Sequence, residues 1–238
     1  MKVQVWSDYV CPFCYIGKRK FENALAAFEH KDQVEIVYKS FELDPAAPLD
    51  ASKDMYETLA GKYGMSIDRA KEMTRGVAQQ AKEVGLDYDF DKMKRTNTRD
   101  AHRLTHYAAE QGKMGEMTEL LLKAYFTESR HIGEHQTLIQ LAEEAGLDPA
   151  EAERVLGAED YNSSVERDIN EASQIGVTGV PFFVFGGKYA VSGAQPPEVF
   201  AEVLHKVWEE QNSAPLIYTG SKDDSSQNDN CSDGSCNI

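Results

Sequence analysis

Alternating apolar and polar residues open the chain. Val3 and Val5 alternate with polar neighbours, which predicts a short strand that ends near residue 7. The next apolar residues recur at helical spacing and predict a helix over residues 11–29: Phe21, Ala24, Leu25 and Phe28. Residues 34–38 (VEIVY) are rich in β-branched side chains and predict a second strand. Strand, helix and strand in this order predict a parallel, right-handed βαβ unit.

The middle of the chain carries mostly helical patterns. Several apolar faces each end at a glycine, which is typical of helix C-termini: Gly85, Gly112, Gly146 and Gly176. Asp148, Pro149 and Glu151 stand where an N-cap, a first-turn proline and a third-position glutamate are expected, so a helix should begin there. The middle segment therefore predicts an all-helical block with apolar faces of its own.

Strand patterns return near the end of the chain. Residues 182–185 (FFVF) and 188–192 read as two strands, and the pair Gly186-Gly187 between them is typical of a hairpin turn. Pro196-Pro197 then opens a last helix, whose inward face is apolar: Val199, Phe200, Val203, Leu204 and Val207. The order βαβ, helical block, ββα predicts an α/β fold in which the two flanks share one sheet.

This order divides the chain into three predicted parts. Residues 1–50 and 176–210 should form a discontinuous α/β domain, and residues 51–175 a helical domain inserted into it. Residues 211–238 hold a single aromatic residue, Tyr218, among Ser, Asn, Asp and Gly. Such a segment buries too little apolar surface to offset its ordering entropy, so we expect a flexible tail.

Composition and charge narrow the classes of function. The chain has 238 residues, 41% of them hydrophobic, which is enough for a buried core. Its formal net charge of −15 argues against nucleic acid or an anionic membrane as partner, because like charges repel. The sequence carries no pattern of a secretory leader or of a bilayer-spanning helix, so we expect a cytoplasmic protein.

Four cysteines form two close pairs, Cys11/Cys14 and Cys231/Cys236. In the cytoplasm such pairs are more often catalytic, redox-sensing or metal-binding than structural. Cys11-Pro12-Phe13-Cys14 stands where the first strand meets the first helix, and a helix N-terminus stabilises a thiolate. Pro12 suits the first helical turn, and the spacing brings the second sulfur one turn along. We therefore predict dithiol–disulfide exchange, with Cys11 attacking and Cys14 resolving the mixed disulfide.

Val180-Pro181, just before the FFVF strand, is a second candidate element of the site. Proline belongs at the first residue of a strand or in a bend, and the residue before it is extended. If the bond between them is cis, the Val180 backbone is exposed beside the thiols, where it could pair with an extended substrate chain. An ordinary trans proline at a strand start is the alternative.

Two motifs together carry a resemblance to a known family. Residues 7–17 (SDYVCPFCYIG) and 176–183 (GVTGVPFF) resemble the DsbA family of thioredoxin-fold oxidoreductases, most closely its cytoplasmic FrnE-like branch. The resemblance spans about residues 1–210 and implies a thioredoxin-like fold with an inserted helical domain. It also implies that Cys11 attacks, Cys14 resolves and Pro181 is a cis-proline. FrnE-like members can carry a CxxxxC tail such as the one from Cys231 to Cys236.

The tail cysteines admit several interpretations. Our hypothesis is that Cys231 or Cys236 reaches the Cys11–Cys14 pair and relays electrons, because a short tether gives an effective concentration of order mM. The alternatives are tail thiols without a role, or a Zn²⁺ site built from all four thiolates. His102/His106 and His131/His135 are each four residues apart and could chelate a metal. Since no HExxH-type pattern accompanies them, we expect surface histidines and no metal site.

The predicted function is therefore thiol:disulfide exchange with protein substrates, with isomerase activity left open. No cofactor is needed besides the redox-active cysteines. The expected partners are proteins with thiols or disulfides and a redox partner such as glutathione or a thioredoxin system; a homodimer is left open. Two other functions remain: a glutathione-dependent transferase or isomerase of the kappa-class or hydroxychromene-carboxylate type, and a thiol-based metal-binding stress protein. The kappa-class branch replaces the first cysteine by serine, whereas this chain keeps Cys11 and Cys14.

Overall fold

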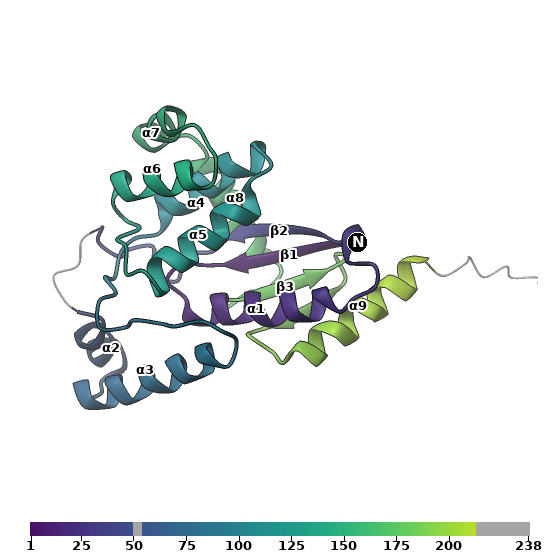
Figure 1. The fold of residues 1–238 in the computed structure, drawn as a ribbon, viewed down its shortest axis with the longest axis horizontal. Helices are drawn as coiled ribbons and strands as arrows, with labels where there is room; N and C mark the ends of the chain where they lie inside the picture. Colours follow the sequence, from purple (N-terminus) through teal and green to yellow (C-terminus); the bar gives the residue numbers. More distant parts are fainter. Residues whose placement is uncertain (50–53, 213–238) are drawn as a thin grey trace, which may run out of the picture.

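The computed structural model describes residues 1–49 and 54–212 (Figure 1). Within them, strands from both ends of the chain form one four-stranded sheet in the order β2-β1-β3-β4. Strand β1 runs parallel to β2 and antiparallel to β3, which pairs antiparallel with β4. The strands are β1 (Lys2–Ser7), β2 (Glu35–Ser40), β3 (Phe182–Phe185) and β4 (Tyr189–Ser192). The prediction that the two flanks share a sheet is therefore confirmed.

Helices α1 (Pro12–Ala26) and α9 (Pro197–Asn212) lie against one face of this sheet (Figure 1). Val3 and Val5 point to that face because alternate residues of a strand share a side. The rings of Phe21, Phe183, Phe185 and Phe200 pack between the sheet and the helices, with ring centroids 4.8–6.5 Å apart. This aromatic core fixes α1, and with it the turn that leads into α1.

Helix α8 (Asn162–Gln174) packs against the opposite face of the sheet. Trp6 is fully buried there together with Ala172 and Val177. The indole N–H of Trp6 donates to the main-chain carbonyl of Asp168, at 3.0 Å. This hydrogen bond thus connects the helical block to β1, the strand that precedes the Cys11–Cys14 motif.

The remaining helices form a second core. Leu104, Met117, Leu121 and Leu141 are fully buried in it, and Tyr15 and Ile16 of α1 join them. In Figure 1, α4–α8 cluster at one side of the sheet, while α2 and α3 lie apart from them. These helices are α2 (Met55–Tyr63), α3 (Ile67–Lys82), α4 (Arg99–Glu110), α5 (Met114–Phe126), α6 (His135–Glu144) and α7 (Pro149–Gly157).

Most predicted helix boundaries are confirmed, and two differ. The Asp148 side chain accepts the Ala150 N–H at 2.9 Å, which is the predicted N-cap of α7. Helix α1 ends at Ala26, earlier than the predicted residue 29, because the Phe28 N–H turns back to the Leu25 carbonyl and leads into a 3₁₀ turn at Lys31–Gln33. Helix α9 continues to Asn212, slightly beyond the predicted boundary at residue 210.

Some predictions fall outside what these residues test. Cys231 and Cys236 lie outside the described residues, as does the predicted tail from residue 213 onward. The division into residues 1–50 with 176–210 and residues 51–175 stays a prediction, since Tyr15 and Ile16 of the first part already belong to the core of the second. Across residues 1–49 and 54–212, no helix has both the length and the apolar character that crossing a membrane requires.

Candidate active site

Strand β1 and helix α1 together position the first cysteine pair. Cys11 is the N-cap of α1 and Pro12 its first residue, so the proline costs no hydrogen bond. The Cys14 N–H donates to the Cys11 carbonyl at 3.0 Å, and the two thiols lie within hydrogen-bonding reach of each other. Both are free thiols and both are buried, at 5% and 2% exposure. The predicted placement at the strand-to-helix junction is confirmed.

The Val180–Pro181 segment meets this pair from far along the chain. The peptide bond between Val180 and Pro181 is cis, as the family resemblance implies. The Cys11 thiol donates to the Val180 carbonyl at 3.4 Å, across a separation of 169 residues. The Pro181 carbonyl accepts the Gly193 N–H at 2.8 Å, which holds the segment against the end of β4. The structure therefore joins the two candidate elements that the sequence singled out.

Cys14 is enclosed by the turn that follows β1. The Asp8 backbone N–H points at the Cys14 Sγ atom, with a nitrogen-to-sulfur distance of 3.5 Å. Burial raises the pKa of the Cys14 thiol well above its ordinary value, and the nearby Cys11 thiol adds to the rise. Hydrogen bonds from Ser7 and from the Asp8 N–H act in the opposite direction. Cys14 is thus held as a protonated thiol with donors already aimed at its sulfur.

The dipeptide between the cysteines is covered on one side and open on the other. Phe13 is 38% exposed, so its ring can contact a partner molecule. The Tyr88 hydroxyl, from the segment between α3 and α4, donates to the Pro12 carbonyl at 2.8 Å. Tyr88 stacks on Phe126 with ring centroids 4.6 Å apart. Sequence analysis missed Tyr88, because nothing in its local sequence indicates a contact with α1.

A hollow of about 600 Å³ lies beside the cysteine motif. Its apolar lining consists of Val10, Leu43, Met55, Leu59 and Tyr125. Charged residues at the same hollow are the ion pair of Arg95 with Asp44, together with Glu57 and Lys62. Val10 directly precedes Cys11, so the residue before the first cysteine forms part of this apolar lining.

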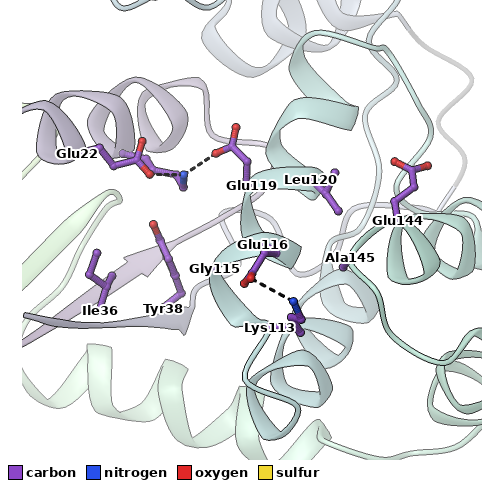
Figure 2. Close-up of a pocket in the computed structure, with 11 residues that line it drawn as sticks. Glu22, Ile36, Tyr38, Lys113, Gly115, Glu116, Glu119, Leu120, Glu144 and Ala145 are labelled. Carbon is purple, nitrogen blue, oxygen red and sulfur yellow. Dashed lines mark hydrogen bonds and ion pairs between the residues drawn. The ribbon is translucent and has the colours of Figure 1, made fainter. Parts of the chain in front are cut away.

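A second hollow, of about 680 Å³, lies between α1, β2, α5 and the end of α6 (Figure 2). Its charges are paired within the protein: Lys18 contacts Glu22 and Glu119, each at 2.5 Å, and Lys113 contacts Glu116 at 3.4 Å. Neither cysteine lines it. The charged side chains of this hollow thus pair with one another, and Lys18 and Glu119 form an ionic contact between α1 and α5.

Glu119 is the centre of that ionic contact. Burial alone would raise the pKa of its carboxyl group, but the hydrogen bond from Arg19 and the charge and hydrogen bond of Lys18 outweigh burial. The net result lowers the pKa of Glu119 from 4.5 to about 2. The Tyr15 hydroxyl, one residue after Cys14, also donates to Glu119 at 2.7 Å. Glu119 therefore anchors the first turns of α1 as an ionised carboxylate.

The prediction that the paired histidines are surface residues is wrong for three of the four. His102 and His131 are 3% and 9% exposed, and the His106 side chain is 14% exposed. The prediction holds for His135. Inside the protein, the His102 Nε2 atom contacts the buried Asp8 carboxylate, at 3.3 Å. Sequence analysis missed Asp8 as well, although it stands within the motif before Cys11. Within residues 1–49 and 54–212, no three or more His, Cys, Asp or Glu side chains are grouped so as to hold a metal ion.

Comparisons with known proteins agree with this geometry. Residues 2–205 match the family model described as a DSBA-like thioredoxin domain. The uncharacterized protein YwbO of Bacillus subtilis is 30% identical over 211 residues, which cover 85% of this chain and 94% of YwbO. Among solved structures, a probable DsbA oxidoreductase from Streptomyces coelicolor is 42% identical, covers 91% of this chain and 94% of its own, and superposes with a TM-score of 0.85.

A more distant structure shares the fold alone. The cytosolic disulfide reductase DsbM of Pseudomonas aeruginosa superposes with a TM-score of 0.61 at 16% identity, over 88% of this chain and all of that one. The mixed α/β thioredoxin-like fold with a helical insertion, expected from the sequence, is confirmed. With a family model that spans nearly the whole described chain, this protein belongs to the DSBA-like thioredoxin domain family of thiol oxidoreductases.

Proposed function

We propose that this protein exchanges disulfides with protein substrates through Cys11 and Cys14. The observation that carries the proposal is the meeting of the Cys11 thiol with the Val180 carbonyl, at 3.4 Å, next to a cis peptide bond. A substrate sulfur that bonds to Cys11 would thereby lie beside the Val180 backbone, with which the substrate chain could pair. Cys14, one turn along α1, is near enough to complete the exchange.

The reaction proceeds in two thiolate attacks. Cys11, having lost its proton, attacks one sulfur of a substrate disulfide, so that a mixed disulfide forms and one substrate thiolate leaves. Cys14, having lost its proton, then attacks the Cys11 sulfur and releases the second substrate thiolate. Two electrons pass from the protein dithiol to the substrate, and the two leaving thiolates take up two protons. A low-molecular-weight thiol such as glutathione, or a thioredoxin system, would reduce the new disulfide again.

An unfolded or extended protein segment is the substrate we propose. The apolar lining of the hollow beside Val10 and the exposed ring of Phe13 suit apolar side chains that flank a substrate cysteine. The same exchange run backwards oxidises a substrate, and attack on a wrong disulfide isomerises it, so direction depends on the potential of the pair. We propose the cytoplasm as its compartment and the FrnE-like branch as its place in the family, on the strength of the motif resemblance.

The decisive test is reduction of insulin disulfides by the full chain, with dithiothreitol as reductant. We expect Cys11→Ser to abolish this activity and Cys14→Ser to retain one attack, so that mixed disulfides between Cys11 and the substrate accumulate and are seen by mass spectrometry. Ser163→Ala, at an exposed position on α8, serves as the matched control and should retain activity. Normal turnover by the Cys11 variant would refute the proposal.

Two other functions make different predictions in the same experiments. A glutathione-dependent transferase or isomerase would need only the first cysteine, so glutathione conjugation would persist in Cys14→Ser. A metal-binding stress protein would bind Zn²⁺ through Cys11, Cys14, Cys231 and Cys236, and a metal titration would detect it. We favour disulfide exchange because this chain keeps Cys14 next to Cys11. A transferase or isomerase of the other type would have no role for Cys14.

A further inference from the structure

A buried chain of contacts leads from the inserted helices to Cys14. The Asp8 N–H points at Cys14 Sγ at 3.5 Å, and the Asp8 carboxylate is itself held at both oxygens. One oxygen accepts the Leu43 N–H at 2.8 Å, and the other lies 3.3 Å from His102 Nε2. Asp8 is fully buried, so these contacts replace the water that the carboxylate gave up. Two distant segments, at Leu43 and at His102, therefore fix Asp8 against the sulfur.

His102 reaches this position from helix α4. An ionised carboxylate only accepts hydrogen bonds, so the contact with Asp8 requires a proton on His102 Nε2. The ring of His102 packs on Tyr9, with ring centroids 4.7 Å apart. The Tyr9 hydroxyl in turn shares a hydrogen bond with Thr105, one turn along α4. The imidazole is held both at its nitrogen and at its face, so it has a single orientation.

The other titratable groups around Asp8 do not compete for this role. Burial raises the pKa of the Tyr9 and Tyr125 hydroxyls above their ordinary value, and the Asp8 charge adds to both rises. Both phenols therefore stay neutral throughout the range in which thiols titrate. Arg95, which faces Tyr125, is paired with Asp44. Neither phenol therefore supplies a charge beside Asp8 in that range.

We propose that His102 is a positioning residue for the resolving step: by holding Asp8, it keeps the Asp8 N–H on Cys14 Sγ. This inference rests on the proposed function, in which Cys14 loses its proton, attacks Cys11 Sγ, forms the Cys11–Cys14 disulfide and releases the substrate thiolate. An N–H aimed at the sulfur stabilises the thiolate that attacks. Burial disfavours the Cys14 thiolate and keeps water away from it. If the Asp8 N–H moves away from the sulfur, water therefore does not replace it as a donor. The inserted helices would then control how fast the mixed disulfide resolves.

His106 provides an internal comparison on the same helix. It lies one turn after His102, and its Nε2 atom is 3.2 Å from the buried Asp168 carboxylate and 3.1 Å from Ser40 Oγ. Asp168 also accepts the Ser40 N–H and the Lys39 ammonium group. Both histidines therefore bind a buried aspartate, but only the aspartate bound by His102 donates to a cysteine.

The test follows the two attacks separately with the disulfide of 5-thio-2-nitrobenzoate as probe. The full chain is used with Cys231 and Cys236 both replaced by serine, so that the tail thiols do not also react with the probe. In reduced form it releases one thionitrobenzoate when Cys11 attacks and a second when Cys14 resolves the mixed disulfide. We expect His102→Leu to leave the first phase unchanged and to slow the second about tenfold at neutral pH, because a hydrogen bond to a charged acceptor is worth about that factor. The rate of the second phase rises with pH as Cys14 loses its proton, and the midpoint of that rise should move to higher pH in this variant. If the leucine variant does not fold, His102→Asn replaces it in the test. The asparagine amide is too short to reach Asp8, so we expect the same slow second phase.

Two further variants separate positioning from general stability. His102→Gln keeps a donor near the Nε2 position and should restore the second phase. His106→Leu should lower the melting temperature and leave both phases at the wild-type rate. A second phase in His102→Leu that keeps its rate, or that slows equally at every pH, would overturn the inference. Absence of the first phase when His102, Cys11 and Cys14 are all intact would instead refute the proposed function itself.

Discussion

Gly17 and Pro181 approach so closely that no side chain fits between them. A Cβ atom on Gly17 would come within 2.9 Å of Pro181 Cγ and within 3.4 Å of the Ala194 backbone. Gly17 stands in helix α1, one turn after the cysteine motif, and Pro181 carries the segment that contacts Cys11. The glycine thus sets how near the proline segment can lie to the thiols.

We predict that Gly17→Ala moves this segment away from Cys11. Alanine favours the helix by about 1 kcal/mol, but overpacking against a rigid proline ring costs about 1–3 kcal/mol. The net result should be a small loss in the free energy of unfolding and a severalfold loss of insulin reduction. Urea denaturation and the reductase assay measure the two effects.

The matched control for this substitution is Gly76→Ala. Gly76 lies within helix α3, and an added Cβ would meet no atom within 4 Å. This variant should be slightly more stable than the wild type, because alanine is the better helix former, and equally active. Equal behaviour of the two alanine variants would show that the contact between Gly17 and Pro181 does not matter.

A second prediction concerns the reactivity of Cys14. Burial, the largest cause of its raised pKa, persists when Cys11 is replaced by serine. In Cys11→Ser, alkylation of Cys14 by iodoacetamide should therefore keep rising with pH beyond about 8.5, where an ordinary cysteine begins to level off. Mass spectrometry of the Cys14 peptide after timed labelling gives the rate. In urea the profile should return to that of a free cysteine, and a folded profile with an ordinary midpoint would contradict the prediction.

The sequence predicts those parts of the site that depend on residues close together along the chain. The alternation of Val3 and Val5 and the spacing of Cys11 and Cys14 depend on neighbours within a few residues, so strand, turn and helix start could be read directly. Pro181 was placed at a strand start for the same reason, and β3 begins at the next residue. The end of α1 was misjudged because no glycine marks it.

The contacts behind the site depend on tertiary packing. Asp8 and His102 are 94 residues apart, and a histidine pair spaced four residues apart is equally compatible with a helix surface. Only the docking of α4 against the end of β1 turns His102 inward, and that docking is set by apolar contacts across the whole insertion. Tyr88 reaches Pro12 through the same packing. No short window of sequence contains this information.

The tail cysteines supply a third prediction. If Cys231 and Cys236 relay electrons to the Cys11–Cys14 pair, a Cys231→Ser, Cys236→Ser double variant should be re-reduced or re-oxidised more slowly, because a tethered dithiol acts at an effective concentration of order mM. Stopped-flow mixing with glutathione measures that rate. Replacing Ser232 and Ser235 by alanine keeps both thiols and is the control. An unchanged rate, turnover and redox potential in the double variant would remove the relay from the mechanism.

The last prediction concerns acid stability through Glu119. Its pKa is about 2 in the folded protein against 4.5 as the ordinary value, so between these values the unfolded chain binds more protons. The stabilising contribution of Glu119 is therefore complete above about pH 4.5 and is lost as the pH falls toward 2. Converted in full, this pKa shift corresponds to a stabilisation of at most about 3 kcal/mol. We expect about 1–2 kcal/mol, because the Glu119 side chain is still 29% exposed and water screens its ion pairs.

Glu119→Gln isolates this contribution. The difference in free energy of unfolding between wild type and variant, from urea titrations, should be about 1–2 kcal/mol at neutral pH and should shrink toward zero on acidification, because the wild-type carboxylate then protonates. Glu116→Gln, on the same helix but 54% exposed, should change stability little at any pH. A Glu119 difference that stays constant down to acid pH would mean that packing against Tyr15, and not the ion pairs with Lys18 and Arg19, stabilises this contact between α1 and α5.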